Sequence, residues 1–204
     1  LKKPVPIEEP LAQQELARAN LEKLRQIAPQ WYPVAAYLDR KGFPLYRNTQ
    51  LHYLPTGEAY LDDMLTVLDT AQRFIFVEYF IMAEGQIWDR LSEILCRKSR
   101  QGVEVKLIFD DFGSMMRMPN EKVEELQDAG VEVKVFNPVH HYVNRLYFNY
   151  RDHRKITCVD GDVAYTGGAN IADEYANLIE RFGYWKDCGV RLEGEGAWGL
   201  TREF

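Results

Sequence analysis

Strand-like and helix-like segments alternate between Thr49 and Phe136, and this alternation limits the chain to a small set of folds. Short runs of β-branched and aromatic residues predict strands, and longer runs with apolar residues three or four apart predict helices. A helix between two strands usually makes a right-handed crossover to a parallel neighbour. The pattern therefore predicts an α/β fold with a mainly parallel mixed β-sheet flanked by helices. The expected strands are 50–54, 74–80, 103–109 and 131–136, and the expected helices are 60–71, 87–100 and 120–128.

Residues 1–48 are expected to form a linker and an amphipathic helix attached to a domain at 49–204. The first ten residues contain three prolines, which favour an extended arm. Residues 11–28 carry apolar side chains at helical spacing, and the helix should end before Pro29. This helix is expected to pack on the domain, and a position near a membrane surface is the alternative. Residues 31–47, with two prolines, are expected to be irregular.

Composition and charge narrow the possible functions. With 204 residues and 46% hydrophobic content, the chain can bury a sizeable core. Its net charge of −6 gives no overall attraction for nucleic acid, so an anion site requires a local basic cluster. Three widely spaced cysteines indicate reduced thiols, and no apolar run reaches membrane-spanning length. The local basic cluster that an anion site requires is present at Arg145, Arg151, Arg154 and Lys155.

The ends of the chain suggest a fragment of a longer protein. The first residue is Leu1 rather than methionine, which suggests a start inside a longer reading frame. Residues 197–204 have the pattern of a helix that stops after its first turns.

Residues 151–161 combine a histidine, a lysine and an aspartate around a short apolar run. His153 and Lys155 are two residues apart, so on an extended strand their side chains share one face. Asp160, followed by glycine, predicts a tight turn into a returning strand at 163–166. An imidazole beside an ammonium group suits a phosphate ester, because one group can attack phosphorus while the other holds its oxygens.

Two glycines and an amide follow the returning strand. Gly167 and Gly168 would let backbone approach the same site closely, and Asn170 would add an amide. A single histidine beside a hairpin would more often be structural, but several groups at fixed spacing favour a phosphate site. Taken together, the spacing resembles the HKD motif of the phospholipase D superfamily, with the matching residues His153, Lys155, Asp160, Gly167, Gly168 and Asn170.

The resemblance extends beyond the motif. Residues 76–81, 102–111 and 150–173 are similar to the amino-terminal catalytic half of bacterial cardiolipin synthases. The resemblance implies that the complete enzyme has membrane helices before Leu1 and a second HKD half after Phe204. It also implies a metal-independent reaction without a cofactor. Asp110 and Asp111 at a strand end could suggest a metal site, but further ligands are missing from the sequence nearby.

Family members use two histidines, one from each HKD motif. One attacks phosphorus to form a phosphohistidine, and the other protonates the leaving alcohol and then deprotonates the incoming one. The resemblance implies that His153 is the nucleophile, with the acid–base role as the alternative. Asp187 matches the carboxylate that orients this histidine, and a solvated strand-end charge is the alternative.

The remaining site residues follow from the same resemblance. Lys155 and Asn170 are expected to hold phosphate oxygens, and Gly168 is assigned to substrate binding, although packing is a simpler role for a glycine. Asp160 belongs to the catalytic motif but lies at the far end of the strand, so setting the turn is its better role. Glu78, inside an apolar strand, is expected to support the site or to form a buried ion pair.

Three functions remain open from the sequence. The first is one half of a cardiolipin synthase, which joins two phosphatidylglycerol molecules through a phosphohistidine and releases glycerol. The second is a single-motif phosphodiesterase or nuclease that acts as a homodimer. The third is an inactive isolated half. The first predicts a phospholipid substrate, a second HKD half as partner and a location at the cytoplasmic face of a bacterial membrane, with no nucleic acid bound.

Two segments could contact lipid. Met115, Met116 and Met118 are expected in a loop, where flexible apolar side chains could meet lipid. Aromatic and aliphatic residues before the motif could line an acyl-chain groove or pack in the core. These residues are Tyr142, Leu146, Tyr147 and Phe148, with Arg145 among them.

Overall fold

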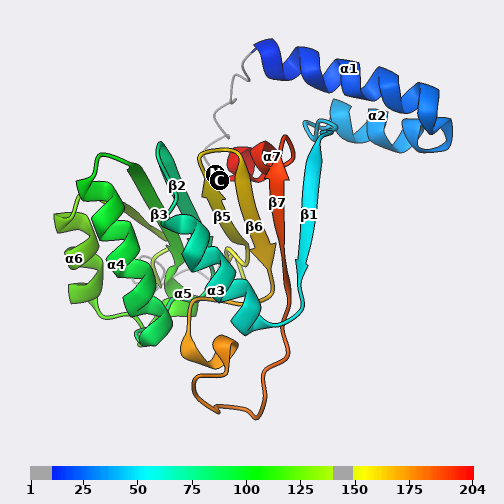
Figure 1. Ribbon diagram of the computed structural model, residues 1–204. Coiled ribbons are helices and arrows are strands. Elements are labelled where there is room, and N and C mark those ends of the chain that lie inside the picture. The colour runs from blue at the N-terminus through cyan, green and yellow to red at the C-terminus, as the bar shows by residue number, and fades with distance from the viewer. Residues whose placement is uncertain (1–10, 140–148) are drawn as a thin grey trace.

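The computed structural model describes residues 11–139 and 149–204, and it places seven strands in one sheet (Figure 1). The strand order is β1-β7-β6-β5-β2-β3-β4. The predicted strands are confirmed with shifts of one or two residues at most ends. The strands are β1 (Thr49–Leu54), β2 (Phe74–Tyr79), β3 (Glu104–Asp110), β4 (Glu132–Phe136), β5 (Lys155–Val159), β6 (Val163–Gly167) and β7 (Gly189–Gly194).

The sheet is mixed, as expected, but its two halves differ in direction. Parallel pairing is confined to β2-β3-β4, where helical crossovers connect the strands. From β2 to β1 every neighbouring pair is antiparallel. The hairpin at Asp160 and Gly161 turns β5 back into β6, so the HKD segment adds antiparallel strands to the parallel half. The expected predominance of parallel pairing therefore holds only for the first half of the domain.

Helices cover both faces of the sheet. The main core lies between the sheet and α3 and α4, where Trp88, Tyr60 and Leu91 are fully buried. The opposite face of β5 and β6 packs Ile156 and Cys158 against α7. The helices of this domain are α3 (Gly57–Leu68), α4 (Gln86–Arg100), α5 (Asp111–Ser114), α6 (Asn120–Asp128) and α7 (Ala197–Glu203), with a short 3-10 helix η3 (Asp173–Ala176).

The predicted N-terminal helix is confirmed as α1 (Leu11–Ile27), and a 3-10 turn η1 (Pro29–Trp31) follows it. The expectation that residues 31–47 are irregular is wrong for α2 (Tyr32–Arg40). Pro33 lies in the first turn of α2, where a missing N–H breaks no helical hydrogen bond. Among the described residues, none of the helices is both long and apolar enough to cross a membrane.

The sequence also predicts a strand at 185–192, but the observed strand begins four residues later, at Gly189. Trp185 instead bonds to Asn177: its N–H donates to Asn177 Oδ1 at 2.7 Å, and its carbonyl accepts from Asn177 Nδ2 at 3.0 Å. These bonds close a loop between β6 and β7, so residues 185–187 are held by that loop rather than by the sheet.

Candidate active site

The HKD residues gather at one end of the sheet. Lys155, the first residue of β5, is opposite Tyr79, the last residue of β2. Gly167 ends β6 and is opposite Gly189, which begins β7. The carboxyl ends of β2, β3 and β6 therefore meet the start of β5, and we call this edge the catalytic end.

His153 and Lys155 contact each other directly. Lys155 Nζ lies 3.0 Å from His153 Nδ1, and it donates to the His153 carbonyl at 2.7 Å. The ring of Phe80 lies 4.8 Å from the imidazole, and the ammonium lies 5.5 Å from the same ring. The Lys155 side chain is buried, whereas His153 is exposed. The pair therefore presents an accessible imidazole backed by a largely buried cation.

The surroundings favour a neutral imidazole beside a charged lysine. Burial and the Lys155 ammonium lower the pKa of His153. Burial lowers the pKa of Lys155 to about 8, although the Asp152 and Asp187 carboxylates oppose this shift. At pH 7, Lys155 is thus mostly charged and His153 mostly neutral. A neutral imidazole can act as a nucleophile, and a cation beside it can stabilise an anionic phosphate.

The contact with Lys155 also selects a tautomer. An ammonium group only donates, so His153 Nδ1 must accept in this contact, and the ring proton is then on Nε2. Attack by Nε2 requires the other tautomer, with the proton on Nδ1. A phosphate that draws the Lys155 ammonium to its own oxygens would release Nδ1 and allow that change.

Asp187 accepts hydrogen bonds from Trp185 and Cys188, and its predicted role in orienting His153 stays a prediction. Its Oδ2 accepts from the Trp185 indole at 3.1 Å, and its Oδ1 accepts from the Cys188 N–H at 2.8 Å. Gly168 lies against this carboxylate, because a Cβ added to it would be 2.2 Å from Asp187 Oδ1. Asp187 lies near enough to raise the pKa of Lys155. The Trp185 indole and the Cys188 N–H therefore orient the Asp187 carboxylate, and Gly168 leaves the space that it occupies.

Asn170 is nearly fully buried, and neighbouring groups use its amide. Its Oδ1 accepts from the Ile81 N–H at 3.0 Å, and its side chain also bonds to Tyr175. The expected phosphate contact by Asn170 stays a prediction. In the described structure, the amide connects the end of β2 to the segment that follows Gly168.

Asp160 lies at the opposite end of β5 from His153, and its assignment to the catalytic residues stays a prediction. Its carboxylate accepts from the backbone N–H groups of Gln72, Arg73 and Phe74 at 2.7–2.8 Å. Asp160 also has a left-handed backbone, with φ of +55°. The three hydrogen bonds lower its pKa despite partial burial. Asp160 thus anchors the start of β2 to the hairpin, as the alternative interpretation expected.

Two buried carboxyl groups and the half-exposed guanidinium of Arg154 form a cluster behind the segment that carries His153. Arg154 Nη2 is 2.5 Å from Glu78 Oε1, and Arg154 Nε is 3.3 Å from Asp152 Oδ1. Burial, reinforced by the Asp152 carboxylate, raises the pKa of Glu78 to about 9 against the opposing charge of Arg154. Burial acts in the same direction on Asp152, but hydrogen bonds from Glu78 and Arg154 lower its pKa overall. Two carboxyl groups therefore share one guanidinium, and the raised pKa of Glu78 favours its protonated form at neutral pH.

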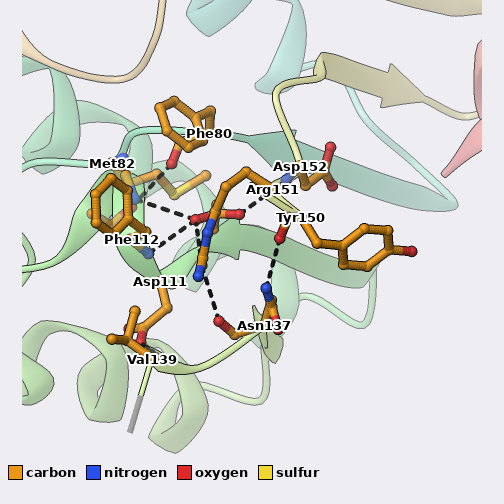
Figure 2. A network of polar contacts seen from close by, with 12 residues as sticks. Phe80, Met82, Asp111, Phe112, Asn137, Val139, Tyr150, Arg151 and Asp152 are labelled. Carbon is orange, nitrogen blue, oxygen red and sulfur yellow. Dashed lines mark hydrogen bonds and ion pairs between the residues drawn. The ribbon is translucent and has the colours of Figure 1, made fainter. Parts of the chain in front are cut away.

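A second network, centred on Asp110, holds the chain just before His153, and the sequence did not reveal it. The Asp110 carboxylate accepts from the Asp152 N–H at 2.9 Å and lies 3.3 Å from Arg151 Nη1. Figure 2 shows Arg151 extending to the Asn137 carbonyl, and Asn137 bonding to the backbone of Tyr150. One feature of the sequence could have indicated this role: an aspartate at a strand end before a short helix commonly caps that helix. Asp110 does so here, because its carboxylate accepts from the N–H groups of Phe112 and Gly113.

Among the described residues, neither Asp110 nor Asp111 has the neighbouring ligands that a metal site needs. Asp111 accepts from the Val139 N–H at 2.6 Å, while Asp110 holds Arg151 and the start of α5. Across residues 11–139 and 149–204, no group of three or more histidine, cysteine, aspartate or glutamate side chains could hold a metal ion. The aromatic residues predicted at 142–148 lie outside the described residues.

A groove of about 590 Å³ runs from His153 and Lys155 along the α7 face of the sheet. Its walls are mainly apolar away from the catalytic end, and they include Phe43, Leu192 and Leu200. A polar reaction centre therefore opens into an apolar channel between the N-terminal segment and α7.

Comparison with known proteins agrees with this geometry. Residues 64–180 match the family described as "Cardiolipin synthase, PLD-like domain". The chain belongs to this phospholipase D-like family. The match includes the HKD segment, the glycine pair and Asn170, and it ends before Asp187.

Individual relatives of this PLD-like domain are bacterial and longer. This chain is 45% identical over 185 residues to an uncharacterized protein of Streptococcus mutans, and the match covers 90% of this chain and 40% of that protein. A cardiolipin synthase of Geobacillus kaustophilus is 35% identical over 185 residues, covering 90% and 36%. One from Oceanobacillus iheyensis is 34% identical, covering 78% and 33%. This chain thus spans well under half the length of these relatives.

Solved structures share the fold of the PLD-like domain. Nuc from Salmonella typhimurium, a phospholipase D family member, has a TM-score of 0.53 and 18% identity, covering 76% of this chain and 90% of its own. A phosphatidylserine synthase of Haemophilus influenzae has a TM-score of 0.57 and 16% identity, covering 76% of this chain and 35% of its own. These similarities support the mixed α/β fold.

Proposed function

We propose that this chain is one of two HKD halves of a bacterial cardiolipin synthase, which joins two phosphatidylglycerol molecules into cardiolipin and releases glycerol. The observation that carries this proposal is 34–35% identity to cardiolipin synthases over most of the chain. The paired His153 and Lys155 support phosphodiester chemistry in particular. The second half is supplied by the remainder of a longer protein, of the kind found among the relatives.

The reaction has two transfers at phosphorus. His153 attacks the phosphorus of the first phosphatidylglycerol, and the bond to the glycerol oxygen breaks as the histidine of the second half protonates that oxygen. A phosphohistidine and free glycerol result. A terminal hydroxyl of the second phosphatidylglycerol then attacks this phosphorus, giving its proton to the second histidine. The P–N bond breaks and cardiolipin leaves. The alternative exchanges the roles of the two histidines.

The local electrostatics suit both transfers. Lys155, mostly charged at pH 7, would hold non-bridging phosphate oxygens beside the attacking nitrogen. The apolar groove next to it could accept an acyl chain of the lipid. We also propose a location at the membrane, on its cytoplasmic face, because the substrate lies there.

A homodimeric phosphodiesterase or nuclease is the second candidate. It is favoured by the similarity in fold to Nuc, of which this chain covers 90%. The net charge of −6 weighs against a nucleic-acid substrate. An isolated half with little activity of its own is compatible with the first proposal.

The test is cardiolipin formation on phosphatidylglycerol vesicles by the complete protein that contains this chain. We expect synthesis, its loss by at least about a hundredfold with His153→Ala, and little change with the matched His52→Ala on β1. A complete protein that makes no cardiolipin, while this chain cleaves DNA in a His153-dependent manner, would establish the nuclease instead.

A further inference from the structure

Two loops at the catalytic end carry exposed apolar side chains. One follows β3, and the other joins β6 to β7. Met116 is 97% exposed and Phe182 is 71% exposed, so neither contributes to the described core. We define the apolar rim as the exposed apolar side chains of these two loops: Met115, Met116, Leu178, Ile179, Phe182 and Tyr184.

One buried carboxylate ties the two loops together. Glu174 bonds to Arg117 Nη2 through Oε1 at 2.7 Å and Oε2 at 2.9 Å. Its Oε1 also accepts from Arg181 Nη1 at 3.1 Å. Arg117 follows Met116, and Arg181 precedes Phe182, so the apolar side chains of both loops are held in one region.

The second loop is also fixed at its base. The paired hydrogen bonds between Asn177 and Trp185 close residues 178–184 into a projecting loop. The Trp185 ring packs against Tyr175 at 4.9 Å and against Phe182 at 6.1 Å. The loop therefore presents its apolar tip from an ordered base. Figure 1 shows this segment, in orange, extending beyond the edge of the sheet.

The rim lies beside the reaction centre. Both loops leave strands at the end where His153 and Lys155 lie, and the second loop contains Gly168 and Asp187. Exposed apolar side chains on α2, such as Val34 and Tyr37, lie near the opposite end of the sheet in Figure 1. Among the described residues, the rim groups six exposed apolar side chains at the catalytic end, where a substrate must reach His153 and Lys155.

We infer that the apolar rim inserts into the surface of a phospholipid bilayer and orients His153 and Lys155 toward lipid headgroups. This inference rests on the proposed function, because a lipid phosphodiester must reach the site from a bilayer. An aromatic ring with a polar tip, such as Tyr184, is favourable at a membrane interface, and methionine adapts to irregular apolar surroundings.

The charges around the rim indicate insertion rather than electrostatic attraction. The nearby cations Arg117, Arg181 and Lys186 are balanced by Glu174, Glu180 and Asp187, and the whole chain carries a net charge of −6. Binding should therefore depend on buried apolar surface and persist in moderate salt.

The experiment measures cosedimentation of the 204-residue chain with vesicles of equal parts phosphatidylglycerol and phosphatidylcholine. We expect the double substitution Ile179→Ser with Phe182→Ser to lower the partition coefficient by about tenfold or more. The reason is that transfer of these two apolar side chains from water into the bilayer contributes to the free energy of binding. Met116→Ser, at the most exposed position, should lower it by a smaller factor. The matched pair Val34→Ser with Tyr37→Ser, on α2, should leave it unchanged.

Three results would overturn the inference: no vesicle binding by the wild type, equal binding by the rim variant, or loss of binding through the α2 variant. A change in sedimentation velocity caused by the rim variant would also overturn it, because the rim would then contact a second copy. Rim-dependent vesicle binding by a protein that makes no cardiolipin would overturn the proposed chemistry alone, so its failure is distinguishable from a failure of the rim. Circular dichroism of each variant confirms the fold.

Discussion

Glu78 gives the chain a pH-dependent stability that a single substitution should remove. Its pKa rises from an ordinary 4.5 to about 9, chiefly because the carboxyl group is fully buried. The native state therefore keeps a proton that the unfolded chain loses above about pH 4.5. The resulting contribution to stability is fully present below that pH and is lost as the pH rises toward 9.

The size of the effect follows from the same shift. Each pH unit between the two pKa values costs about 1.4 kcal/mol of unfolding free energy. From pH 6.5 to pH 8, Glu78 should cost the wild type about 2 kcal/mol. Glu78→Gln keeps a neutral hydrogen-bonding side chain of similar size, so this contribution should disappear. With a urea m-value of about 2 kcal/mol/M, the wild-type midpoint should fall by about 1 M more than that of the variant.

Urea unfolding at pH 6.5, 7.25 and 8 measures the difference. Comparison between the two proteins cancels contributions from His153 and Lys155, whose pKa values are lowered by burial. Glu203→Gln is the matched control, because Glu203 lies 3.8 Å from the same Arg154 but is 47% exposed. Parallel pH dependences for wild type and Glu78→Gln would refute the idea that Glu78 is protonated in the fold.

Three further predictions concern the HKD residues. Asp160→Asn should lower the free energy of unfolding in urea by about 1–3 kcal/mol, because one carboxylate accepts three backbone N–H groups. Cardiolipin synthesis by the complete protein should persist. A loss of synthesis as large as that caused by His153→Ala would contradict this. Gly168→Ala should displace Asp187, lower the melting temperature and reduce synthesis, and an unchanged protein would show that the close approach is not required. Lys155→Met should raise the pKa of His153 toward its ordinary value, measured by NMR titration, and a fall would contradict the assigned cause.

Local sequence pattern was enough for most elements, because periodicity and turn residues act over a few positions. The helix at 120–128 was predicted with its observed ends, and β2 and β5 differ by at most one residue. α2 was missed because Pro33 and Pro44 suggested an irregular segment, although Pro33 occupies the first helical turn and Pro44 follows the helix. The HKD spacing likewise brought His153 and Lys155 together, since both flank the start of one strand.

The sequence by itself determined the α/β elements, the family and the close pairing of His153 with Lys155. Tertiary structure alone decided the antiparallel half of the sheet, the partners of Asp187 and the cluster that joins Glu78 to Arg154. It also brought together the two loops of the apolar rim through Glu174. These features depend on which distant segments share a buried charge, and the cost of burying it unpaired selects the partners only once the chain has folded.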